Sequence, residues 1–282
     1  MKKLILLAMI ALALTAGTMV LNGAGNTKAQ TTCTDPAGCV SQVYECFNLQ
    51  GGRDQPLPDP RAIVRLITQN FGGDAVRVRQ ARQMCELALK FPPGSTPGGT
   101  AFQTSIFECF NIERGSDPND RYLLTTANFG PDVVTVRKAN TMCEEATKAN
   151  AAGVIFGSID QPRVWECYRL NDGDKPNLPF TLLTNNFGPD GVTVRDAFMM
   201  CEEARKDRPT AAGVVSIGEP TGNVLECYHL RSQLDPKAVV TLNTTNFGSH
   251  QATVRNAIVM CEPAQKTPLF DLPGGDDTSG SD

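Results

Sequence analysis

Residues 164–206 read VWECYRLNDGDKPNLPFTLLTNNFGPDGVTVRDAFMMCEEARK, and similar stretches occur at three other places in the chain. Each copy has Glu-Cys-aromatic near its start, then Asn-Phe-Gly, then Val-Arg, and finally Met-Cys-Glu followed by Lys. The second cysteine always lies fourteen residues after the Phe of Asn-Phe-Gly, and the Arg always lies eight residues after it. A fixed register of this kind indicates a tandem array of one small module.

The spacing of the copies divides the chain into repeats, connections and two terminal segments. The first connection is rich in Pro and Gly and is typical of a linker, whereas the next two share Ala-Ala-Gly-Val and then β-branched residues, which favours a strand. The last residues are Gly, Ser, Thr and Asp, which bury little apolar surface and predict disorder. The expected segments are a signal peptide (1–29), an N-terminal loop (30–42), repeat 1 (43–90), a linker (91–105), repeat 2 (106–148), a spacer (149–163), repeat 3 (164–206), a spacer (207–223), repeat 4 (224–266) and a disordered acidic tail (267–282).

Cysteine usage predicts disulfides and an oxidising compartment. All ten cysteines lie after residue 29, and an even number of widely spaced cysteines in an exported chain favours five disulfides over metal ligation. The chain has no Cys-x-x-Cys pair and only two histidines, so neither a metal site nor a cofactor is expected. Repetition suggests one pair within each repeat, with the two remaining cysteines closing a small loop. The expected pairs are Cys33–Cys39, Cys46–Cys85, Cys109–Cys143, Cys167–Cys201 and Cys227–Cys261.

The N-terminus predicts export. Lys2 and Lys3 precede an apolar run at 4–14 and a segment of small residues, which together are typical of a secretory signal peptide cleaved after Ala29. The alternative is an uncleaved anchor helix, although the apolar run is shorter than the roughly 20 residues that a spanning helix needs. We expect an extracytoplasmic protein, secreted or periplasmic, with no membrane insertion after cleavage. A net charge of −4 without a basic cluster argues against a nucleic-acid partner.

Within each repeat the residue pattern predicts mainly strands. The opening segment, such as 164–170, mixes β-branched, aromatic and polar residues, and Val-Thr-Val-Arg alternates with period two. Asn-Phe-Gly predicts a turn in which Gly130 or Gly188 takes a positive φ. The final segment allows two interpretations, because apolar residues recur at helical spacing over 139–146, whereas Pro263 in the fourth copy favours a strand. The expected fold is all-β, a tandem array of four small disulfide-clamped β-rich modules, with a possible short helix at the end of each.

The disulfides are expected to compensate for small modules. A repeat of this size buries too little apolar surface to be stable by itself. A disulfide between its first and last segments should contribute about 3 to 4 kcal/mol by restricting the unfolded chain. We expect the Phe of Asn-Phe-Gly and the aromatic residue after the first cysteine to pack against that disulfide.

Glutamates flank both cysteines of every repeat. The predicted disulfide brings the two carboxyl groups together, which would permit an acid/base pair, but pairing with the recurring Arg or Lys better explains their presence in every copy. Acidic loops at 117–120 and 171–174 could offer oxygen ligands to calcium, yet neither matches a calcium loop and turn chemistry explains both. The sequence contains no recognisable catalytic motif, so no catalytic residue is assigned and an enzyme is not expected. The glutamates are Glu45, Glu108, Glu166 and Glu226 before the first cysteine, and Glu86, Glu144, Glu202 and Glu262 after the second.

The recurring Glu-Cys-(Phe/Tyr), Asn-Phe-Gly, Val-Arg and Met-Cys-Glu elements resemble a family of uncharacterised repeat domains in secreted bacterial proteins. Those domains also open with a Cys-Tyr strand and close with a Cys-Pro-x-x-Lys-like segment, which Cys261-Glu262-Pro263-Ala264-Gln265-Lys266 matches best. The first three repeats lack that Pro. The resemblance covers nearly all of residues 43–266 and implies a small β-rich extracytoplasmic module, with no activity or catalytic residue to transfer.

These observations lead to two functional hypotheses. The first is a non-catalytic repeat protein with a structural or multivalent binding role at or near the cell surface, where tandem sites raise effective concentration. Its partner would be an extracellular protein or an envelope polysaccharide. The second is a secreted inhibitor or toxin-like protein that acts through disulfide-supported loops, because the loops between the first two segments differ from repeat to repeat.

Overall fold

The computed structural model describes residues 41–50, 63–93, 105–160 and 162–269, and the regular elements in these ranges are all β-strands. The all-β expectation is therefore confirmed, and the last segment of each repeat is strand and not helix. The signal peptide, the predicted Cys33–Cys39 pair, most of the first linker and the end of the acidic tail lie outside the described residues.

Each repeat contributes a first strand, a second strand and a long third strand. The first strands are β1 (Ser41–Gln50), β4 (Ile106–Glu113), β8 (Val164–Asn171) and β12 (Val224–Ser232). The second strands are β2 (Ile63–Thr68), β5 (Asp120–Thr126), β9 (Leu178–Thr184) and β13 (Ala238–Thr244). The long strands are β3 (Gly72–Phe91), β6 (Gly130–Ala149), β10 (Gly188–Thr210) and β14 (Gly248–Pro268). The Ala-Ala-Gly-Val connections add the short strands β7 (Ile155–Phe156) and β11 (Gly213–Ile217).

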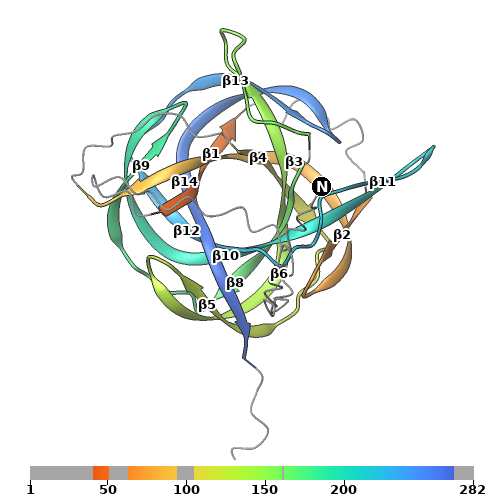
Figure 1. Cartoon of the computed structure of the whole chain (residues 1–282), viewed down its shortest axis with the longest axis horizontal. Helices are drawn as coiled ribbons and strands as arrows, with labels where there is room; N and C mark the ends of the chain where they lie inside the picture. Colours follow the sequence, from red (N-terminus) through yellow and green to blue (C-terminus); the bar gives the residue numbers. More distant parts are fainter. Residues whose placement is uncertain (1–40, 51–62, 94–104, 161, 270–282) are drawn as a thin grey trace, which may run out of the picture. The chain divides into compact units, whose positions relative to one another are not determined.

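The first strands and the long strands close into an antiparallel ring. β1 pairs with β3, β3 with β4, β4 with β6, β6 with β8, β8 with β10, β10 with β12, β12 with β14, and β14 with β1, which gives eight strands in the described chain. Figure 1 shows these strands arranged around a common centre. Closure pairs both edges of a ring strand, which removes the exposed edges of an open sheet.

The second strands connect repeats that are two positions apart. Each forms a hairpin with the start of its own long strand and also pairs with the end of another: β2 with β10, β5 with β14, β9 with β3, and β13 with β6. The exchange is reciprocal, since the first and third repeats lend strands to each other, as do the second and fourth. The repeats are therefore interlocked parts of one sheet.

The Asn-Phe-Gly segments form the predicted hairpin turns. The glycine after Phe has a positive φ in every repeat, including 78° at Gly130 and 75° at Gly188, where a Cβ would be strained. The Phe backbone N–H donates to the hydroxyl of the Thr three residues earlier, at 3.2 Å in each turn. This bond fixes the direction in which the Asn and Phe side chains leave the turn.

The two faces of the ring strands carry different side chains, because successive residues of a strand point to opposite faces. Four disulfides join a first strand to a long strand, and they lie in one buried cluster with Tyr44, Phe107, Trp165 and Leu225. The disulfide-bonded pairs are Cys46–Cys85, Cys109–Cys143, Cys167–Cys201 and Cys227–Cys261.

The Phe of Asn-Phe-Gly and the aromatic residue after the first cysteine pack on the opposite face, which corrects their expected contact with the disulfide. The aromatic after each first cysteine is one residue from it and so points away from the sulfur atoms. It meets the Phe of Asn-Phe-Gly from the repeat two positions away. The ring centroids lie 4.6 to 4.8 Å apart in the pairs Phe47–Phe187, Phe71–Tyr168, Phe110–Phe247 and Phe129–Tyr228.

Candidate functional site

Buried lysine sites lie between successive repeats. In each site, the Lys that ends a repeat meets the Glu after the second cysteine of the preceding repeat. The same Glu accepts a hydrogen bond from the Asn of the Asn-Phe-Gly turn in the following repeat, and the Lys amine lies over the Phe ring of that turn. The arrangement is cyclic, because the fourth repeat precedes the first. The lysine sites are Lys90–Glu262–Asn128–Phe129, Lys148–Glu86–Asn186–Phe187, Lys206–Glu144–Asn246–Phe247 and Lys266–Glu202–Asn70–Phe71.

The Glu carboxylate of each lysine site bridges the Lys amine and the Asn amide. Lys90 Nζ lies 2.9 Å from Glu262 Oε2, and Asn128 Nδ2 donates to the same oxygen at 2.6 Å. In the other three sites Lys again contacts Glu, and the Asn Nδ2 donates to the same carboxylate at 2.8 to 3.3 Å. One carboxylate thus holds an amine and an amide side by side.

Aromatic rings cover each lysine amine. Every Nζ lies 4.4 Å from the centroid of the Phe ring in its own site. Three amines have a second ring: Phe180 is 4.6 Å from Lys90 Nζ, Tyr122 is 4.5 Å from Lys266 Nζ, and Phe156 is 5.6 Å from Lys148 Nζ. A cation over an aromatic face is attracted by the ring quadrupole, and the rings exclude water from the ion pair.

Burial lowers the pKa of the four lysine amines. The side chains of Lys90 and Lys206 are fully buried, and desolvation lowers the pKa of both amines, opposed by the charge of the partner Glu. Desolvation lowers the pKa of Lys148 and of Lys266 to about 7.

Strand periodicity explains how the sequence places these groups. Glu86 follows Cys85 and therefore points to the face opposite the disulfide, and Lys90, four residues later, points to that same face. The Asn and Phe arrive from another repeat, at the end of a hairpin. The sequence reasoning recognised the recurring Glu, Lys, Asn and Phe but not their assembly into one site. The only available indication was the constant spacing of these residues from the cysteines, which is odd for Glu and Lys and so places both on the face opposite the disulfide. The Lys and the Asn come close only because the ring of strands closes.

A second set of buried acids lies next to the lysine sites. Glu45 is directly across the ladder from Glu86, Glu108 from Glu144, and Glu226 from Glu262, so the expected approach of two carboxyl groups is observed. The Glu before the first cysteine also faces a residue from the repeat two positions away. These opposing pairs are Glu45–Asp190, Glu166–Asp74, Glu226–Asp132 and Glu108–His250.

Burial raises the pKa of each of these glutamates. Desolvation, and then the neighbouring Asp, raises the pKa of Glu45 well above its ordinary value and the pKa of Glu166 and of Glu226 to about 8. Glu108 differs, because His250 Nε2 lies 2.9 Å from its Oε1 and opposes the desolvation that raises its pKa. The four repeats therefore contain three carboxyl–carboxyl pairs and one histidine–carboxyl pair.

The sequence predicts that the recurring glutamates pair with the recurring Arg or Lys, and in the structure these two cations lie in different places. Lys pairs with the Glu after the second cysteine, inside the protein. The recurring Arg instead binds acidic residues at the surface, at the end of a first strand or just beyond it: Arg79 contacts Glu113 at 2.7 Å, and Arg255 contacts Asp235 at 2.8 Å. Neither pattern places an acid and a base around an exposed reaction centre.

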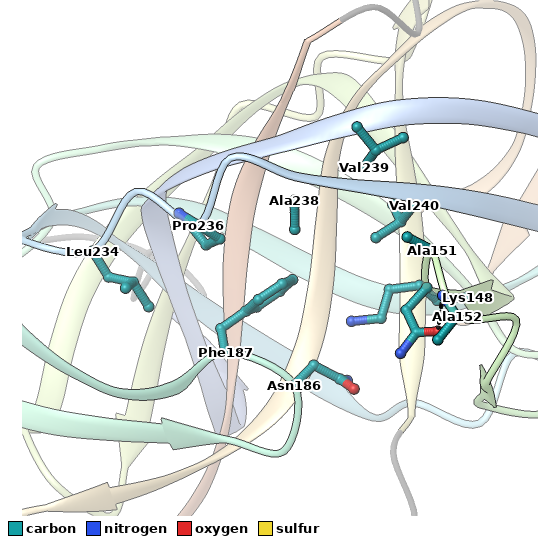
Figure 2. A pocket seen from close by; sticks show the side chains of 11 residues that line it. Lys148, Ala151, Ala152, Asn186, Phe187, Leu234, Pro236, Ala238, Val239 and Val240 are labelled. Atoms are coloured by element: carbon teal, nitrogen blue, oxygen red, sulfur yellow. Dashed lines mark hydrogen bonds between the residues drawn. The ribbon is translucent and has the colours of Figure 1, made fainter.

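A pocket opens beside one lysine site. It has a volume of about 560 Å³ and is lined by Lys148, Asn186, Phe187, Leu234, Pro236 and Val240, together with neighbouring residues of the same segments. Figure 2 shows that these side chains come from three repeats and surround one space. Its size and mixed lining are in the range of sites for small ligands or for part of a polymer.

Two further features concern metals and membranes. In the described part of the chain, no group of three or more His, Cys, Asp and Glu is placed to hold a metal ion. No helix in the same residues has the length and apolar character needed to cross a membrane.

Comparison of the chain with protein-family models, curated proteins and solved structures finds no match.

Proposed function

We propose that this protein is a non-catalytic structural and binding element that works outside the cytoplasm, at or near the cell surface. The fully formed disulfides of the described repeats fit an oxidising environment. Export through the N-terminal signal peptide, to the periplasm or the medium, is part of the proposal. The observation that carries the binding role is the pocket beside Lys148, which three repeats build together.

The interlocked sheet changes how multivalent binding would work. Independent modules on flexible linkers would each carry a site and gain avidity from linkage. Here the repeats share strands, so their loops are held at fixed positions on one body. The first strands all run antiparallel to their long neighbours, which brings the variable loops that follow β4, β8 and β12 to the same end of the ring.

Backbone anchoring holds these loops in similar positions although their side chains differ. Ser116 N donates to Asp74 Oδ2 at 2.6 Å, and Asp174 N donates to Asp132 Oδ2 at 2.8 Å. Leu234 N donates to the equivalent Asp of the third repeat at 3.2 Å. Leu234 also lines the pocket, so that loop and the pocket form one continuous candidate surface. An envelope polysaccharide or an extracellular protein is the proposed partner.

Filling the pocket tests this proposal. The full mature chain and an Ala152→Trp variant, which places an indole at the pocket rim, are sedimented with the envelope polysaccharides of the producing cell. Ala212→Trp is the matched control, because Ala212 holds the same place in the next Ala-Ala-Gly-Val connection. We expect saturable binding by the wild type and by Ala212→Trp, and loss with Ala152→Trp. Equal binding by all three proteins would remove the pocket from the proposal, and no binding by any would favour a protein partner.

The anchored loops also support the alternative of a secreted inhibitor or toxin-like protein. Rigid backbone with different side chains is the arrangement by which protein inhibitors present loops to enzymes. A panel of secreted proteases would test the commonest form of this alternative. Inhibition that is lost when Lys175, an exposed residue of the loop after β8, becomes Ala would support it. Absence of inhibition across the panel would contradict it.

A further inference from the structure

The geometry of the lysine sites points to a covalent modification. We propose that each site forms an amide bond between the Lys side chain and the Asn side chain, with release of ammonia. The inference concerns the scaffold itself and does not depend on the binding role proposed above.

The reacting groups of each site share one carboxylate. Lys90 Nζ and Asn128 Nδ2 contact the same oxygen of Glu262, at 2.9 and 2.6 Å. Lys266 Nζ and Asn70 Nδ2 likewise share Oε1 of Glu202, with the Asn donor at 2.8 Å. In these two sites a single oxygen atom thus bridges the amine and the leaving nitrogen of the amide, so the two reactants are held next to each other.

The neighbouring aromatic residue fixes the position of the amine. The Phe ring under each Nζ belongs to the residue directly after the reacting Asn, at 4.4 Å from ring centroid to nitrogen. In Figure 2 the Lys148 amine points toward the space between Asn186 and Phe187. The backbone bond that fixes each Asn-Phe-Gly turn also holds the amide in place.

Burial supplies the required protonation states. An amine attacks a carbonyl carbon only when it is neutral, and desolvation lowers the pKa of Lys148 and of Lys266 to about 7. The Glu accepts the ammonium proton and becomes a carboxylic acid. That acid lies against the Asn Nδ2, where it can protonate the leaving group.

The reaction then proceeds by attack and elimination. The Nζ lone pair forms a bond to the Asn Cγ, and the C=O π electrons move to oxygen. Glu delivers its proton to Nδ2 and receives one from the attacking nitrogen. The carbonyl re-forms, the Cγ–Nδ2 bond breaks with its electron pair on nitrogen, and ammonia leaves. Amine and amide become a secondary amide and ammonia, one proton remains on Glu, and no oxidant or activating cofactor is consumed.

The proposed amide bonds would link successive repeats around the ring of strands. They join the first repeat to the second, the second to the third, the third to the fourth, and the fourth back to the first, while the disulfides cross-link each repeat internally. The side-chain bonds would then link all four repeats covalently, including the fourth to the first. The four bonds are Lys90–Asn128, Lys148–Asn186, Lys206–Asn246 and Lys266–Asn70.

Intact mass spectrometry of the purified mature chain, denatured and fully reduced, tests the proposal. Each amide bond lowers the mass by about 17 Da relative to the sequence, and complete reaction lowers it by about 68 Da. Proteolysis should yield branched peptides that join the Lys and Asn of one site. A wild-type mass equal to the sequence mass, without branched peptides, would overturn the proposal and leave buried ion pairs in its place.

Variants at one site assign the chemistry, with the other three sites as internal folding controls. Lys148→Arg and Asn186→Ala each remove a reactant, and Glu86→Gln removes the proton carrier while both reactants remain. We expect the mass of each variant to lie about 51 Da below the mass of its own sequence, which is three losses of about 17 Da in place of four. Four losses in Glu86→Gln would contradict the assigned role of the carboxylate, even if the wild-type mass supports the bonds.

Discussion

Replacing Glu226 by Gln should make the protein less sensitive to alkaline pH. Glu226 is fully buried beside Asp132, and its pKa is raised from 4.5 to about 8, mainly by desolvation and then by that Asp. The folded protein holds the proton more tightly than the unfolded chain does. The stabilising contribution is fully present below about pH 4.5 and is lost as the pH rises toward about 8.

The size of this loss of stability follows from the shift in the pKa of Glu226. One unit of pKa corresponds to about 1.4 kcal/mol, so the shift from 4.5 to about 8 means that the ionised Glu226 should destabilise the fold by on the order of 5 kcal/mol above pH 8. A Gln amide can still accept the Tyr228 hydroxyl, which now bonds Glu226 Oε2 at 2.7 Å, and it can donate to Asp132 without losing a proton. The variant should therefore be more stable than the wild type at pH 9, and within about 1 kcal/mol of it at pH 5.

Guanidinium unfolding of the oxidised chain from pH 5 to 9 measures this difference. The difference in unfolding free energy should grow with pH by at most about 1.4 kcal/mol per unit, as expected for one proton. The exposed Glu219→Gln provides the control and should show no pH-dependent difference. A constant difference between Glu226→Gln and the wild type at all pH values would refute the assignment of a folded-state proton to Glu226.

Three other changes probe the sheet, the disulfides and the aromatic contacts. Replacing both Cys109 and Cys143 by Ala should lower the unfolding free energy by about 4 kcal/mol, from a closed loop with a sequence separation of 34, and denaturant titration would show it. Deleting residues 224–269 should unfold the second repeat as well as the fourth, because β5 and β6 lose their partners β14 and β13, whereas repeats 1 to 3 of a linear array would keep their circular dichroism. Phe129→Ala should cost about 3 to 5 kcal/mol, and Phe198→Ala, which alters a stack with a surface histidine, should cost much less in the same titration.

Local features of the fold were predictable from the sequence because they depend on residues close together in one repeat. The period-two pattern in Val-Thr-Val-Arg, the positive φ at Gly130 and the pairing of Cys109 with Cys143 each follow from short-range geometry or from repetition. The competing helical pattern over residues 139–146 was misleading, since the small and sulfur-containing residues there face two different buried layers of a strand.

The lysine sites could not be derived in the same way. Lys148 ends the second repeat, Asn186 lies in the middle of the third, and Glu86 belongs to the first. Their meeting depends on ring closure, which no local pattern encodes. The same reason explains the aromatic residues, which were expected at the disulfide of their own repeat and instead pack two repeats away.

The number of repeats follows from two kinds of contact. The lysine sites join each repeat to its neighbours, and that chain of contacts would close with any number of copies. The strand exchange joins each repeat to the one two positions on: β2 pairs with β10, and β9 pairs back with β3. If each repeat exchanges strands with the repeat two positions on, the exchange is mutual between two repeats only when the ring contains four copies. With five copies the repeats two positions on and two positions back would be different repeats, so the exchange could not be mutual, and with three copies the second neighbour would be the preceding repeat. The recurrence of Glu, Lys, Asn and Phe in every copy is therefore explained by closure of one ring, without any need for four independent functional sites.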